Sequence, residues 1–195
     1  MTAENLILLI LAQASGRLSG KTLLQKRAYF VSEILDFRLG FRPHYYGPYS
    51  DIIDNGIAQC KALGFIQEQT QGFGIVNNGF EVMRYDYSLT GDGEKVVEFL
   101  KKENSEECTS VFDCLATLAK AGDSSDYMML SFAAKTFLIL KQTNAPMKSE
   151  EIRNAAERLN WNISPESLQK AVDFLKHIGL IEDTGVIKVN TPVAI

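Results

Sequence analysis

The sequence predicts a mostly α-helical protein with small β-hairpins, that is, a protein of the α+β class. Apolar residues recur at three- and four-residue steps in most of the long segments, which is the spacing of one helix face. Short stretches in which apolar and polar residues alternate follow these helices in both halves of the chain. Hydrophobic residues make up 46% and charged residues 23% of the 195 residues, which is ordinary for one large or two small globular domains.

The chain opens with two expected helices. Residues 4–13 are apolar on nearly every side, which is typical of a buried helix. Residues 15–20 contain two glycines and two serines and predict a turn. Residues 21–39 carry an apolar stripe that predicts a second helix, with Gln25 and Lys26 on its opposite, polar side.

A third helix and a β-hairpin are expected next. Proline fits the first helical position, where no N–H partner is needed, so the helix is expected to begin at Pro48. Residues 65–71 and 80–90 alternate as strands do, and residues 72–74 (Gly-Phe-Gly) are expected to form the turn between them. The hydroxyl of Thr90 can cap the helix that follows it.

The second half repeats this order of elements. Residues 124–142 predict a long apolar helix, and residues 149–161 predict a helix with Ser149 as its N-cap. Pro165 opens a third helix by the same proline rule. Residues 180–189 predict a short hairpin with Thr-Gly at its turn.

This order predicts two tandem winged helix-turn-helix units. In a winged helix, three helices form a helix-turn-helix core and a β-hairpin, the wing, follows them. The polar stretch 103–108 marks the expected boundary, so the two domains are residues 1–104 and 105–195. The prediction rests on the shared order of elements, because the two halves have no close sequence repeat.

Residue types of catalytic and metal sites are sparse in this chain. Three cysteines (Cys60, Cys108 and Cys114) are an odd number without metal-ligand spacing, which predicts free thiols in a reducing cytosol. Pairing His44 with Cys60 or Asp51 gives no complete nucleophilic site, because no oxyanion-hole signature lies near them. No apolar run reaches the ~18 residues of a membrane span. We therefore expect a cytoplasmic, non-enzymatic protein without metal, cofactor or membrane association.

A candidate binding surface surrounds the start of the third helix, where the sequence reads YYGPYS. In a helix-turn-helix protein, the first residues of this helix meet base edges and nearby basic side chains hold phosphates. The predicted residues, for DNA or for a protein partner, are Lys21, Gln25, Lys26, Arg42, His44, Tyr45, Tyr49, Ser50, Asp51, Asn55 and Lys61. Packing of the tyrosines over the core beneath the wing is an alternative that the sequence leaves open.

Two stretches resemble known families. The pattern K-x-x-LQK-x-x-Y/F of residues 20–34 and the pattern YGP-x-S of residues 41–54 resemble the YwgA-like family of regulatory proteins and the related SocA-like (Panacea) antitoxin domain. The matching positions are Lys21, Leu24, Gln25, Lys26, Tyr29 or Phe30, Tyr46, Gly47, Pro48 and Ser50. Residues 130–141 and 159–181 resemble the second half of the YwgA-like pattern. The resemblance implies a winged-helix fold, and Arg27 departs from the apolar residue of the related helices.

Two functions follow as hypotheses. The first is a DNA-binding transcriptional regulator whose partner is duplex DNA, favoured by seven Lys/Arg against five Asp/Glu in residues 1–64. The second is a protein-interaction module, an antitoxin-like or phage-defence-associated adaptor that holds a toxin or defence protein. It is favoured by the SocA-like motif and by nine Lys/Arg against twelve Asp/Glu in residues 105–195. The apolar residues 128–140 fit either a homodimer contact or a buried core helix.

Overall fold

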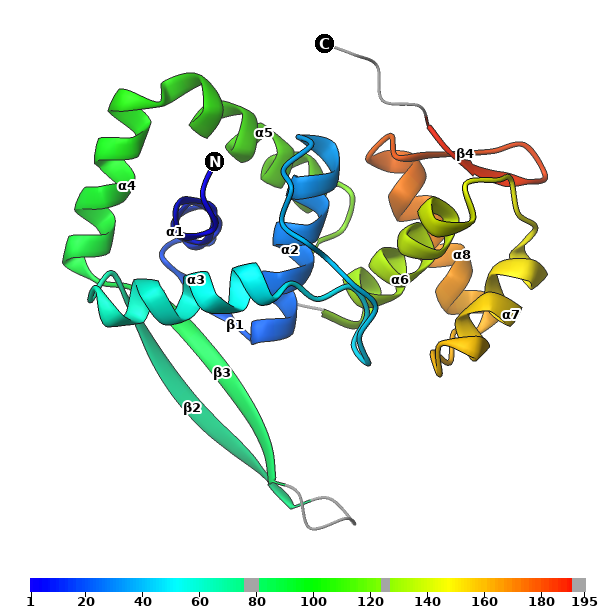
Figure 1. The fold of residues 1–195 in the computed structure, drawn as a ribbon, viewed down its shortest axis with the longest axis horizontal. Helices are drawn as coiled ribbons and strands as arrows, with labels where there is room; N and C mark the ends of the chain where they lie inside the picture. Colours follow the sequence, from blue (N-terminus) through cyan, green and yellow to red (C-terminus); the bar gives the residue numbers. More distant parts are fainter. Residues whose placement is uncertain (76–80, 124–126, 191–195) are drawn as a thin grey trace. The chain divides into compact units, whose positions relative to one another are not determined.

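The computed structural model describes residues 1–75, 81–123 and 127–190, and these fall into two compact units (Figure 1). Unit 1 comprises Met1–Gly40 and Ser50–Ala116, and unit 2 comprises Phe41–Tyr49 and Thr117–Ile195. The sequence suggested one boundary after residue 104. In the structure the chain passes between the units three times, because a short internal segment belongs with unit 2.

Helices dominate both units, and the strands form small antiparallel hairpins, so the α+β class is confirmed. Within the described residues, no helix combines the length and the apolar character needed to cross a bilayer. The elements of unit 1 are α1 (Ala3–Gln13), β1 (Arg17–Ser19), α2 (Lys21–Ile34), α3 (Asp51–Ala62), β2 (Ile66–Ile75), β3 (Glu81–Leu89), α4 (Gly91–Glu103) and most of α5 (Ser105–Lys120).

Helix α1 forms the centre of unit 1, with α2, α3 and α4 around it in Figure 1. Its residues from Leu6 to Leu11 are all buried, which explains why the segment is apolar on nearly every side. The helix begins at Thr2, whose hydroxyl accepts the N–H of Asn5 at 3.2 Å. The predicted buried helix is therefore confirmed.

Residues 15–20 form more than the predicted turn, because β1 lies within them. β1 pairs antiparallel with β3, with Arg17 opposite Ser88 and Ser19 opposite Asp86. The three-stranded sheet has the order β1-β3-β2. Local glycines and serines indicate a turn but give no sign of this pairing, which joins residues far apart in the sequence.

The hairpin β2–β3 is longer than predicted, and the prediction of a turn at residues 72–74 is wrong. Gly72 lies opposite Met83, and β2 continues to Ile75 after an irregularity in the register. Glycine is a strong turn signal, yet an edge strand tolerates it at a bulge. The residues that join the two strands lie outside the described part of the chain.

Helix α2 ends earlier than predicted, and helix α3 begins later than predicted. α2 ends at Ile34, and Asp36 takes a left-handed conformation with φ of 54°. α3 begins at Asp51 rather than at Pro48, because Ser50 is extended and its hydroxyl accepts the N–H of Ile53 at 3.2 Å. The start of α3 is thus set by a serine cap.

Helix α5 is missing from the sequence prediction. Its polar first turn has the composition of a domain boundary, and the sequence predicts a boundary there. Cys108, Val111, Leu115 and Leu118 are buried along one side at helical spacing, so the apolar pattern was present but began late.

Unit 2 contains α6 (Tyr127–Thr143), α7 (Ser149–Arg158), α8 (Pro165–His177), β4 (Ile181–Asp183) and β5 (Ile187–Val189). The N-cap of α7 is Lys148 and not Ser149, because the side chain of Glu151 reaches back and accepts the N–H of Lys148 at 2.6 Å. The predicted start of α8 is confirmed, and Ser164 caps it by accepting the N–H of Ser167 at 3.1 Å.

Candidate functional site

The predicted site residues with exposed aromatic rings lie in the short segment Phe41–Tyr49, which belongs to unit 2. Arg42 and Tyr49 exchange two backbone hydrogen bonds, with N···O distances of 3.0 and 2.9 Å, and so close the segment into a small loop. At its tip the N–H of Gly47 donates to the carbonyl of His44 at 2.9 Å. Residues 44–47 therefore form a β-turn, called the aromatic turn below.

Two side chains of unit 2 fix the backbone of the aromatic turn. The indole N–H of Trp161 donates to the carbonyl of His44 at 2.9 Å, and the hydroxyl of Ser131 donates to the carbonyl of Tyr46 at 2.6 Å. Trp161 is 1% exposed and is one of the largest fully buried side chains of the described residues. Because both contacts use backbone carbonyls, they leave the side chains of the turn available at the surface.

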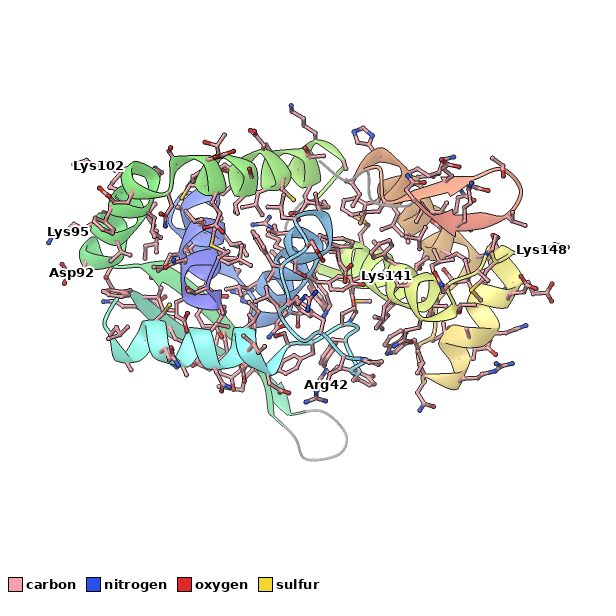
Figure 2. All side chains as sticks on the ribbon, turned by 45° about the horizontal axis from the view of Figure 1, so that its top comes forward. Arg42, Asp92, Lys95, Lys102, Lys141 and Lys148 are labelled. Atoms are coloured by element: carbon pink, nitrogen blue, oxygen red, sulfur yellow. The ribbon has the colours of Figure 1, made fainter. Side chains whose placement is uncertain are left out.

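The rings of the aromatic turn are strongly exposed. Tyr45 is 70% and Tyr46 48% exposed, and the two rings meet edge to face with centroids 4.9 Å apart. The ring of His44 lies 5.0 Å from that of Tyr49, and the guanidinium of Arg42 lies 6.0 Å from the centre of Tyr49. Figure 2 shows the Arg42 side chain directed away from the ribbon that carries it. Aromatic rings and the guanidinium of Arg42 thus share one small surface.

Gln25 and Ser50, two other predicted site residues, are buried in unit 1. The side-chain amide of Gln25 donates to the carbonyl of Ser50 and accepts its N–H, both at 3.0 Å. The hydroxyl of Ser50 also donates to the carbonyl of Leu39. With 1% and 0% exposure, Gln25 and Ser50 hold the start of α3 in place and offer no surface for a partner.

The predicted lysines do not form an exposed positive strip across α2 and α3. Lys26 is 1% exposed, which contradicts its predicted place on a polar face. Lys21 forms a salt bridge with Asp54, and Lys61 forms one with Glu68 at 2.5 Å. Carboxylates of the same unit therefore offset the charge of both accessible lysines.

The exposed side of α3 is polar and acidic near its start. Asp51 and Asn55 are exposed, as predicted for side chains that meet a partner, and Ile52 between them is 47% exposed. Asp51 and Asp54 lie in the first helical turn, where the helix dipole favours negative charge. This surface repels phosphates more than it attracts them.

The charge of the two units differs from the charge of the two sequence halves. Unit 1 contains ten Lys/Arg and fifteen Asp/Glu, a formal charge of −5, whereas unit 2 contains ten and nine, a formal charge of +1. The positive excess of residues 1–64 disappears because the acids of α4 and α5 fold into the same unit. Arg42 adds its charge to unit 2 instead.

The thiols show no sign of activation. Burial raises the pKa of Cys60 and of Cys114 to about 12, so both stay protonated near neutral pH and are poor nucleophiles. Among the described residues, no three His, Cys, Asp or Glu side chains gather in a way that could hold a metal ion.

Ser131 and Lys135 have structural roles that the sequence did not predict. Lys135 is 9% exposed, and its ammonium lies 5.4 Å from the ring of Trp161 and 5.8 Å from that of Phe132. Burial lowers the pKa of Lys135. Polar residues inside the apolar stretch 130–140 were the available signal, since such residues need partners when buried.

Neither the protein-family models nor the curated proteins with which the chain was compared match it.

Proposed function

We propose that this chain is a non-enzymatic protein of the winged-helix type that binds another protein through the aromatic turn. The observation that carries the proposal is the contrast within the turn between a fixed backbone and exposed rings. Trp161 and Ser131 hold the carbonyls of His44 and Tyr46, while Tyr45 and Tyr46 are 70% and 48% exposed.

The order of elements supports the winged-helix type. In unit 1 the order α1, β1, α2, α3, β2, β3 gives three helices and a β-hairpin, joined by one short strand between the first two helices. Unit 2 has α6, α7, α8, β4 and β5 in the same order. Kinship with the YwgA-like and SocA-like families belongs to this proposal and rests on the motifs around Gln25 and Pro48.

The chemistry of the aromatic turn suits a protein partner. Tyrosine and arginine are enriched at the energetic centres of protein interfaces, because they offer a large contact area together with polar groups. A turn whose backbone is already fixed loses little conformational freedom on binding, which favours affinity. The partner expected for such a surface is a protein such as a toxin or a defence protein, which this chain would hold in an antitoxin-like or adaptor role.

DNA-binding regulation stays the competing prediction. Asn55 and Arg42 are exposed and could reach a base edge or a phosphate. Against it stand the burial of Lys26, the salt bridges of Lys21 and Lys61, and the charge of −5 on unit 1. Protein binding is therefore the function with the better support.

Site-specific photo-crosslinking in cells tests the protein-binding proposal. A benzoylphenylalanine at position 45 should form one dominant crosslinked product with another protein, and Tyr46→Ala in the same chain should reduce its yield several-fold. The matched control is the same photo-reactive residue at Phe99, an aromatic side chain of α4 that is 62% exposed. Equal products from both positions, or none from position 45, would count against the proposal.

Fluorescence anisotropy with duplex DNA tests the competing function. A DNA-binding protein should lose affinity steeply between ~50 and ~200 mM salt, because phosphate contacts release counterions. We expect no salt-sensitive binding with random or promoter DNA. Strong, salt-sensitive binding that is weakened by Asn55→Ala and is indifferent to Tyr45→Ala would favour the regulator instead.

A further inference from the structure

Strand β2 is the outermost strand of the described sheet, and one long edge of it is open. The sheet order is β1-β3-β2, so β3 has neighbours on both sides and β2 has one. β2 is 10 residues long, whereas β1 has only 3 and covers β3 from Asp86 to Ser88. In Figure 1 the two long strands extend away from the helices of unit 1.

The register shows which backbone groups of β2 point outward. The N–H of Thr90 donates to the carbonyl of Phe65 at 3.0 Å, so Phe65 faces β3. In an antiparallel pair the N–H and C=O of one residue point to the same side, and the side alternates along the strand. Gln67, Gln69 and Gln71 therefore face β3. Glu68, Thr70 and Gly72 direct their backbone groups to the open edge.

This edge lacks the usual protection against pairing with another strand. Natural edge strands are protected by lysines, prolines, other charges or a covering element. β2 (IQEQTQGFGI) contains one charged residue, Glu68, and neither lysine nor proline. β3 carries Glu81, Arg84 and Asp86 within its 9 residues. β3 thus carries more charged residues that discourage pairing with a foreign strand than β2 does, although β2 is the strand with the open edge.

One face of the hairpin continues the core outward. Tyr87 is 1% exposed, and the next residues on the same face of β3, Tyr85 and Met83, are 37% and 38% exposed. Beyond the end of β1 this hairpin is only two strands wide. Two-stranded ribbons are marginally stable in water unless a further strand or a helix covers them.

We propose that β2 pairs antiparallel with β2 of a second copy of this chain, about a two-fold axis at Thr70. The segment Gln69-Thr70-Gln71 is the same in both directions, so each Gln69 faces Gln71 of the other copy. The outward groups match as well, because Thr70 faces Thr70 and Glu68 faces Gly72 across the axis.

The self-complementarity of β2 favours a second copy over an unrelated strand. No like charges meet in this register, since the only charged residue of each β2 lies opposite a glycine. The pairing uses the open β2 edge of both copies, so no β2 edge is left for a third copy and the pairing closes at a dimer. The result is a six-stranded sheet, four strands wide at the axis beyond the ends of the β1 strands, in which Tyr85 and Met83 of both copies extend one apolar face. This dimer does not involve the aromatic turn, and the two proposals stand or fall separately.

Charge substitutions at the axis test the dimer by sedimentation-velocity centrifugation of the full chain. We expect a dimer for the unmodified protein, and at least tenfold weaker dimerisation for Thr70→Lys and for Thr70→Glu, because like charges meet at the axis. An equimolar mixture of the two variants should recover the dimer, since Lys then faces Glu. The matched control is Gln67→Lys, which adds the same charge to an exposed position of β2 away from the axis and should keep the dimer.

Three outcomes would overturn the proposal. These are a monomer at all concentrations of the unmodified protein, a dimer that Thr70→Lys leaves unchanged, and loss of the dimer in both variants without recovery on mixing. The last result would indicate a foreign strand or another register. Far-UV circular dichroism of each variant shows whether the fold is kept, and Thr70 is exposed, so we expect it to be kept.

Discussion

Units 1 and 2 arrange their elements in the same order, and they differ in how the second and third helices are joined. The shared order includes a short extended segment between the first two helices. In unit 1, β1 lies between α1 and α2 and pairs with β3, the second strand of the hairpin. In unit 2, Met147 lies between α6 and α7 and exchanges two backbone hydrogen bonds, at 2.9 and 2.8 Å, with Ile187 in the second strand of its hairpin. In both units, therefore, a short segment between the first two helices pairs with the second strand of the hairpin.

The difference lies in how each third helix begins. α7 and α8 are joined by residues 159–164, and the local cap Ser164 starts α8. α2 and α3 are separated by residues 35–50, and the start of α3 is held by Gln25, which is 25 positions away from Ser50. A long connection needs a tertiary hydrogen bond to fix the helix that follows it. The same length supplies the residues of the aromatic turn.

Each unit has its own intrinsic probe, so the comparison can be tested in one protein. All three cysteines lie in unit 1, and the single tryptophan, Trp161, lies in unit 2. Thiol labelling during denaturation reports on the opening of unit 1, while tryptophan fluorescence reports on unit 2.

The largest effect is expected from Gln25→Leu in unit 1. The substitution leaves the N–H of Ser50 buried without a partner, which costs about 1–3 kcal/mol. It also removes one of the two hydrogen bonds that the carbonyl of Ser50 accepts, at a further cost of about 0.5–1.5 kcal/mol, while the N–H of Asp54 still donates to that carbonyl at 3.1 Å. We expect the free energy of unfolding of unit 1 to fall by about 2–4 kcal/mol, measured by thiol labelling across a urea titration. Gln59→Leu is the matched control, because Gln59 is exposed on α3 and should change stability by less than ~0.5 kcal/mol. Equal effects of the two substitutions would show that Gln25 does not hold α3.

A somewhat smaller effect is expected from Trp161→Phe in unit 2. Phenylalanine keeps most of the buried ring but loses the hydrogen bond to the carbonyl of His44, so we expect the free energy of unfolding of unit 2 to fall by about 1–3 kcal/mol. Circular dichroism across a urea titration measures this loss, because the variant lacks the only tryptophan. The aromatic turn should also become more accessible. Chymotrypsin cleavage after Tyr45 and Tyr46 should speed up, while cleavage near the exposed Tyr127 stays unchanged. Unaltered cleavage of the turn would mean that Trp161 does not fix it.

The local cap of α8 should matter less than the long-range contact of α3. Ser164→Ala removes the hydroxyl that accepts the N–H of Ser167, and the loss of an N-cap costs about 1 kcal/mol. Tryptophan fluorescence should report this decrease in unit 2, with no change in thiol labelling of unit 1. A decrease as large as that from Gln25→Leu would remove the distinction between the two helix starts.

The smallest and most distinctive effect concerns pH, because the two units should respond in opposite directions. Burial raises the pKa of Cys60 from 9.0 to about 12, so between these values the unfolded chain holds fewer protons and unit 1 loses stability as pH rises. Burial lowers the pKa of Lys135 below its usual 10.5. Below that value the unfolded chain holds more protons, so unit 2 gains stability as pH rises.

Urea titrations at about pH 7.5 and about pH 9.5 test this opposition. Tryptophan fluorescence follows the unfolding of unit 2. The loss of helical circular dichroism signal that occurs without a change in fluorescence follows the unfolding of unit 1. Lys135→Met should abolish the gain in unit 2 and leave the loss in unit 1. Parallel shifts of both units would contradict the assignment of these two groups.

Helix α1, the cap at Thr90 and the start of α8 could all be predicted from the sequence. Each depends on residues within a few positions of one another: the apolar run of α1, the hydroxyl of Thr90 that accepts the N–H of Gly93 at 3.1 Å, and the Ser164-Pro165 pair. The predicted site was recovered only in part. Tyr45 and Arg42 are exposed as expected, whereas Gln25 and Lys26 are buried.

Pattern and capping chemistry by themselves determined the order of the hairpins and of every described helix except α5, because these signals act over three or four residues. Only the tertiary structure decided that Gln25 holds Ser50, that β1 joins β3, and that residues 41–49 belong to unit 2. Those contacts join distant parts of the chain. The spacing of apolar residues along a helix does not distinguish a glutamine that will be buried from one that will be exposed. Its burial depends on which surfaces meet when the chain folds.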